Sequence, residues 1–126
     1  MQLRTPLAQI RGLGSAREGV GHWKMQRLTA IANLFLVLWF LISSISLAGA
    51  SYEETRAWLS SPLSTTFMLL LIGSSFYHAK LGVQVVIEDY VHHEGIKLAS
   101  LLAVTLACIV FAAACAVAIL KTSLGS

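Results

Sequence analysis

The residues best suited to chemistry lie in one segment, from Phe76 to Tyr90. It places His78 inside a long apolar run and an Asp89-Tyr90 pair at the end of the same run. Ionisable groups are costly within a membrane, so they mark candidate functional sites. A neutral imidazole in a helix bundle can ligate haem iron. A tyrosine hydroxyl can donate a hydrogen bond to a quinone carbonyl, and a neighbouring carboxylate can orient it or relay a proton.

Helical spacing places these groups along one face. Asp89 lies eleven residues after His78, about 16 Å along a helix and within about 20° of the same face. Gly82 is one turn from His78 and removes bulk where a flat ligand would approach. The spacing predicts a flat cofactor at His78 and a polar site nearer the membrane surface. Two plainer interpretations stay open: a histidine hydrogen-bonded to a neighbouring helix, and a tyrosine of the aromatic belt beside a solvated acid.

A second polar stripe, Lys80, Gln84 and Glu88, follows the i, i+4, i+8 spacing on roughly the opposite face. A lysine at this depth is not expected to face lipid. Pairing within the chain, contact with a partner helix and approach to a cofactor carboxylate are all open for Lys80.

The elements that position these groups are membrane helices. Of the 126 residues, 56% are hydrophobic and 12% charged, and charges are absent from 28–52, 57–79 and 98–120. Each gap exceeds the roughly 20 residues that a helix needs to cross the hydrocarbon core. The sequence predicts an all-α integral membrane protein with spanning helices near 28–48, 63–90 and 97–120. Three helices enclose little interior. Partner helices are therefore expected to complete any cofactor site.

The charges also predict an orientation, because Lys and Arg accumulate in cytoplasmic flanks. Six of these residues lie on the side of the N-terminus and the 91–96 loop: Arg4, Arg11, Arg17, Lys24, Arg27 and Lys97. Two lie on the other side: Arg56 and Lys121. We expect a cytoplasmic or matrix tail over 1–27, an anchor over 28–120 and an opposite-side tail over 121–126. The net charge of +3 then reflects topology, and no nucleic-acid partner is expected because basic runs with interleaved aromatics are absent.

The flanking segments look less regular. Residues 1–22 contain several glycines and Pro6, which favours an extended tail. Residues 49–61 are expected to form a short external loop, with Trp58 at the interface and Pro62 in a position that suits a helix start. Cys108 and Cys115 lie seven residues apart on one face and are expected to be buried small apolar residues.

These residues resemble a known family. Gly12-Leu13-Gly14-Ser15-Ala16, then His22-Trp23 and Gln26-Arg27-Leu28-Thr29-Ala30, are similar to the N-terminal portion of the succinate dehydrogenase hydrophobic membrane anchor subunits. His78, Gly82 and Asp89-Tyr90-Val91-His92 resemble the second transmembrane helix of the same family. The similarity covers 12–34 and 76–93 together with the three-helix topology.

The resemblance implies a partnership with a cytochrome b556 membrane subunit, an iron–sulfur subunit and a flavoprotein subunit. It implies that His78 is one axial ligand of haem b, with the other from the partner. It also implies that Tyr90 hydrogen-bonds ubiquinone, that Asp89 is the acid beside it, and that Arg27 lies near the quinone and the haem propionates. The chain would then be a non-catalytic anchor in a bacterial or mitochondrial inner membrane, apart from the succinate chemistry.

Two other functions fit the residues. One is a cytochrome b anchor of another respiratory enzyme, such as fumarate reductase. The other is a small transporter or proton-conducting protein in which Lys80, Glu88 and His78 form a relay.

Overall fold

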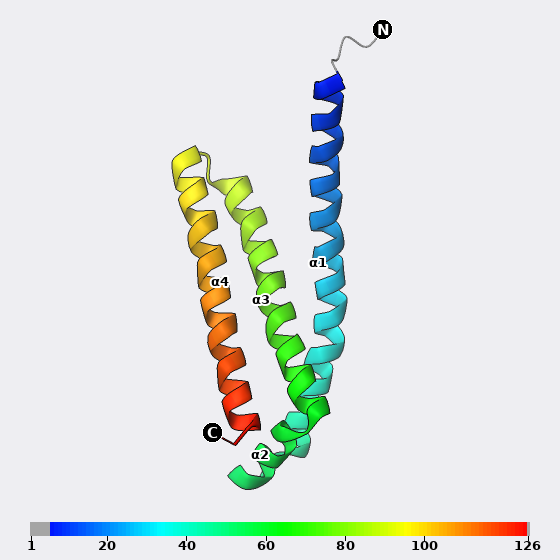
Figure 1. Ribbon diagram of the computed structural model, residues 1–126, viewed down its shortest axis with the longest axis vertical. Helices are drawn as coiled ribbons and strands as arrows, with labels where there is room; N and C mark the ends of the chain where they lie inside the picture. Colours follow the sequence, from blue (N-terminus) through cyan, green and yellow to red (C-terminus); the bar gives the residue numbers. More distant parts are fainter. Residues whose placement is uncertain (1–5, 126) are drawn as a thin grey trace.

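Helices make up the chain that the structure describes. The computed structural model describes the backbone of residues 6–125 and the side chains of residues 20–125. Over that part of the chain it contains α1 (Pro6–Ser46), α2 (Tyr52–Ser60), α3 (Pro62–Tyr90) and α4 (Glu94–Ser123) (Figure 1). Val20–Ser46, Pro62–Tyr90 and Glu94–Ser123 are each long and apolar enough to cross a membrane. The prediction of an all-α membrane fold with three spanning helices is confirmed.

The helix α3 lies between the other two long helices and packs against both (Figure 1). A turn at residues 91–93 reverses the chain between α3 and α4, and we call this end of the molecule the turn end. The short helix α2 and the end of α4 lie at the opposite end, which we call the α2 end (Figure 1). Every consecutive pair of long helices is therefore antiparallel, and α3 has two seams, one with α1 and one with α4.

Aromatic contacts join α1, α2 and α3 at the α2 end. The indole of Trp39 on α1 stacks on Trp58 of α2, with ring centroids 5.5 Å apart, and meets Phe67 of α3 edge-on at 5.2 Å. Such pairs contribute about 0.5–1.5 kcal/mol beyond the area that they bury. At the same end the hydroxyls of Thr65 and Ser123 lie 2.8 Å apart and join α3 to α4. These contacts join the four helices at the α2 end, and from there α1 and α3 separate toward the turn end (Figure 1).

The structure corrects two expectations about the flanking segments. The predicted loop at 49–61 contains the helix α2, because Ser51 and Glu54 form a capping box: the Ser51 hydroxyl accepts from the Glu54 N–H at 3.1 Å, and the Ser51 N–H donates to Glu54 Oε2 at 2.7 Å. The extended tail predicted for residues 1–22 is also wrong over residues 6–22, which belong to α1. Pro6 occupies the first helical position, and a glycine within a helix costs only about 1 kcal/mol. Residues 1–5 lie outside the described chain.

Few apolar side chains are covered within the chain itself. Of the side chains described, the buried hydrophobic ones are Leu71, Leu81 and Ile119, while large apolar residues along α1 and α4 are exposed. Lipid and partner helices must cover those faces, because exposed apolar area of this extent is characteristic of membrane and interaction surfaces. The side chains that this chain itself covers therefore lie in two helix seams, one between α1 and α3 and one between α3 and α4.

Candidate functional site

The side chain of His78 meets the first helix across the α1–α3 seam. Its Nδ1 lies 2.9 Å from Oγ1 of Thr29, and the imidazole is half-buried while Thr29 is only 7% exposed. Neighbouring polar contacts continue the seam toward the α2 end. The Ser74 hydroxyl donates to the backbone carbonyl of Thr29 at 3.4 Å, and the Ser75 hydroxyl donates to Asn33 Oδ1 at 3.4 Å. Polar side chains therefore set the register of α1 on α3.

A groove opens on the other side of this contact, toward the turn end. It has a volume of about 560 Å³, and it is lined by His22, Trp23, Gln26 and Arg27 of α1 and by Gly82 and Val85 of α3. Gly82 and Val85 lie four and seven residues after His78, so they share its face. The predicted role of Gly82 fits this geometry, because a Cβ at that position would meet nothing within 4 Å. The groove therefore lies along the α1–α3 seam between the His78 contact and the Asp89-Tyr90 end of α3.

Two polar atoms of the groove residues lack partners. His22 Nε2 and Gln26 Oε1 are both buried and have no hydrogen-bond partner in the described chain. An unpaired buried polar group costs about 1–3 kcal/mol, so such atoms are expected to be satisfied by something outside this chain. The guanidinium of Arg27 also lines the groove and lies 5.4 Å from the centre of the Trp23 ring. The groove is thus lined by a cationic, an amide and an imidazole side chain, those of Arg27, Gln26 and His22.

The remaining predicted site residues lie at the turn end. Asp89 and Tyr90 close α3, and both are exposed, Tyr90 by 77%. The helix places Tyr90 about 18 Å from His78 along its axis. The structure brings His78, Gly82 and Arg27 to one seam, and it leaves the Asp89-Tyr90 pair apart from them at the turn end.

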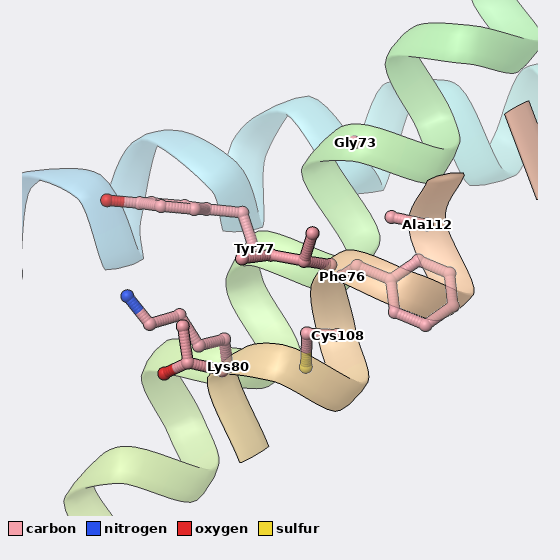
Figure 2. Close-up of a pocket in the computed structure, with 8 residues that line it drawn as sticks. Gly73, Phe76, Tyr77, Lys80, Cys108 and Ala112 are labelled. Carbon is pink, nitrogen blue, oxygen red and sulfur yellow. The ribbon is translucent and has the colours of Figure 1, made fainter. Parts of the chain in front are cut away.

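The second polar stripe does not join this site. Gln84 Nε2 donates to Glu88 Oε1 at 3.0 Å, whereas the Lys80 ammonium lies 5.7 Å from the centre of the Tyr77 ring. Figure 2 shows Lys80 and Tyr77 extending to the same side of α3. Both line a cavity of about 260 Å³ in the α3–α4 seam, together with Cys108 and Ala112 of α4. A relay from Lys80 to His78 would have to pass from one seam to the other.

The other histidines and the cysteines have plainer surroundings. His93 caps α4, because its Nδ1 accepts from the Ile96 N–H at 3.2 Å, and His92 is exposed in the turn. Cys108 and Cys115 are free thiols, half-buried rather than fully buried as expected.

Sequence reasoning did not single out His22, Gln26 or Thr29 as site residues. They occur with Asn33 at spacings of four, three and four residues, which is a polar stripe on one face of an otherwise apolar helix. That periodicity is the signal that could have identified the α1 side of the seam.

Comparisons with known proteins identify relatives of this chain. A family model described as the succinate dehydrogenase/fumarate reductase transmembrane subunit matches residues 1–114. The succinate dehydrogenase hydrophobic membrane anchor subunit of Rickettsia bellii is 33% identical over 103 residues, covering 82% of each chain. The subunit of the same name from Rickettsia conorii is 30% identical over 92% of this chain and 93% of the relative. That from Paracoccus denitrificans is 30% identical over 90% and 88%. The chain belongs to the family of succinate dehydrogenase hydrophobic membrane anchor subunits.

Proposed function

We propose that this chain anchors a succinate:quinone oxidoreductase in the bacterial inner membrane, co-ligates haem b through His78 and forms part of the ubiquinone-reduction site with Tyr90 and Asp89. The observation that carries the haem assignment is the α1–α3 groove. Two of its lining residues, Gly82 and Val85, share the helix face of His78. A side chain at Gly82 would meet nothing within the chain, and one buried polar atom on each of His22 and Gln26 lacks a partner within the described chain.

The residues of the groove fit a haem. Haem in a helix bundle takes its iron ligands from facing helices, and the chain offers His78 as one ligand, with the second from the cytochrome b556 subunit. The Arg27 guanidinium would hold a propionate, because it is a permanent cation that pairs well with carboxylates. Gly82 leaves room for a flat ring. A bound haem would supply a one-electron redox centre beside the quinone site.

The turn end fits a quinone headgroup. The phenol of Tyr90 is exposed there and would donate a hydrogen bond to a quinone carbonyl, while the adjacent Asp89 would orient it or hold a proton for transfer. The iron–sulfur and flavoprotein subunits would lie on this side. The relatives are named for succinate dehydrogenase, whereas the family description also covers fumarate reductase. The anchor role is the same in either complex, and the soluble subunits decide the substrate.

The test of haem ligation is His78→Ala in the assembled complex. Losing an iron ligand should abolish or alter the low-spin haem spectrum measured by redox difference spectroscopy. His92→Ala and His93→Ala are the matched controls, because both residues lie at the turn, and each should keep the wild-type spectrum. An unchanged low-spin spectrum in assembled His78→Ala would exclude the ligation.

We also propose that the N-terminus and the 91–96 loop are cytoplasmic and that the C-terminus is periplasmic. The support is the six-to-two distribution of Lys and Arg, together with the turn end and the α2 end lying at opposite ends of the molecule (Figure 1). Reporter fusions in the 92–95 loop and after Ser126 should report opposite sides of the membrane. The same side for both would contradict this topology.

A further inference from the structure

Thr29 is a buried polar residue of α1, and its hydroxyl contacts more than one polar group. Its exposed fraction is 7%. Oγ1 lies 2.7 Å from the carbonyl oxygen of Met25, 3.2 Å from that of Gln26 and 2.9 Å from His78 Nδ1. Because so little of Thr29 is exposed, the two carbonyls and the imidazole are the partners that the chain offers to its hydroxyl.

The proton inventory assigns a direction to each contact. A threonine hydroxyl has one proton and two lone pairs. The two carbonyl oxygens can only accept, so the hydroxyl proton lies toward the α1 backbone, as is common for threonine within helices. Two oxygens at 2.7 Å without a proton between them would repel. Oγ1 must then accept from His78, which requires that Nδ1 carries the ring proton.

A protonated Nδ1 leaves Nε2 with the free lone pair in the neutral imidazole. Iron ligation needs that lone pair, and the hydrogen bond on the other nitrogen fixes both the tautomer and the orientation of a ligating ring. We propose that Thr29 is the positioning residue for His78: its hydroxyl, held by the backbone of α1, accepts the Nδ1 proton and so presents Nε2 to the haem iron. This inference rests on the proposed haem ligation by His78.

The hydrogen bond also has an electronic consequence. Donation from Nδ1–H to Oγ1 makes the imidazole a stronger electron donor, and a more basic ligand favours the ferric over the ferrous state. Removing the acceptor should therefore move the haem midpoint potential to a more positive value. Loss of an outer partner of this kind typically lowers metal or cofactor retention by roughly ten- to a hundredfold.

The experiment uses the full assembled complex and two matched pairs. Thr29→Val keeps the shape of threonine but removes the hydroxyl. Thr29→Ser and Thr29→Cys have nearly the same size and differ in oxygen against the weakly accepting sulfur. Thr29→Val and Thr29→Cys should show a positive shift of the haem potential, altered low-spin EPR g-values and weaker haem retention. Wild type and Thr29→Ser should agree with each other.

Two further variants separate the causes. Ser75→Ala removes a neighbouring contact of the same seam, Ser75 to Asn33, and should leave the potential and the g-values at wild-type values. If Thr29→Ser shifts as far as Thr29→Cys, the hydroxyl is not the cause and the proposal is overturned. The cysteine–serine pair decides the question if Thr29→Val does not assemble. If His78→Ala loses its low-spin haem while every Thr29 variant matches wild type, ligation stands and the role of Thr29 alone is refuted.

Discussion

The two seams of α3 differ in the chemistry that holds them together. Toward α1, polar contacts lie within the candidate membrane spans: Thr29 meets His78, and Asn33 meets Ser75. Toward α4, the direct side-chain hydrogen bond is at the α2 end, between Thr65 and Ser123, and the middle of the seam is an apolar cavity beside Lys80.

That difference matters because polar side chains are expensive within a membrane unless they are paired or functional. In the α1–α3 seam these polar side chains are paired. The groove, whose lining residues include two unpartnered buried polar atoms, lies next to them along the same seam. In the α3–α4 seam, small residues such as Ala112 face apolar ones, which is how helices pack without a ligand. The difference supports the proposal that the first seam binds the cofactor, whereas the second seam serves helix packing.

Filling the groove should have the largest effect of the changes considered, and the affected quantity is the haem content of the complex. At Gly82 an added side chain would meet nothing within the chain, so Gly82→Leu should let the chain fold but occupy the space of the haem. Overpacking a site typically costs about 1–3 kcal/mol, so haem content per assembled complex should fall by roughly five- to a hundredfold. Pyridine haemochrome assay of the purified complex measures it.

Gly73→Leu is the matched control for that variant. Gly73 is also open at its Cβ position, but it lines the α3–α4 cavity, nine residues and half a rotation from Gly82. Its haem content should stay at the wild-type level. Equal losses in both variants would mean that α3 tolerates no bulk, and the seams would then not differ in function.

The sequence was sufficient for the spanning helices, because three uncharged runs of bilayer length leave few alternatives. The sequence also singled out His78, because an imidazole within an apolar run is unusual; the structure shows its contact with Thr29, and its role as an iron ligand stays a prediction. It was not sufficient to identify Thr29 as the partner of His78, because helical periodicity gives the face of a residue but not the helix that faces it. The start of α1 at Pro6 was missed since glycines weaken a helix without ending it, and α2 because the Ser51–Glu54 capping box was read as a loop.

The hydroxyl of Tyr90 should have an intermediate effect, limited to quinone chemistry. Tyr90→Phe keeps the ring but removes one hydrogen bond, worth about 1 kcal/mol, or roughly fivefold in binding. The ratio of quinone-linked to artificial-acceptor activity with succinate should fall several-fold, with haem content unchanged because His78 is intact. Tyr77→Phe, in the α3–α4 seam, is the control and should leave the ratio alone. If Tyr90→Phe keeps the wild-type ratio, Tyr90 is only an aromatic-belt residue, and the quinone headgroup must bind to the partner subunits.

The smallest effect is expected from Lys80. Its ammonium lies over Tyr77 in the α3–α4 seam, and helical geometry separates it from His78 by about 200° of rotation. Lys80→Met removes the cation but keeps a long apolar stem, so haem content and the quinone-linked ratio should match wild type.

Arg27→Gln removes the cation of the other seam instead, and it should weaken haem retention several-fold because the guanidinium lines the groove. Measuring haem loss from both assembled variants during a wash with detergent tests the pair. If Lys80→Met loses haem as fast as Arg27→Gln, then Lys80 approaches a cofactor carboxylate after all, and the seam with α4 would have to be counted as part of the haem site.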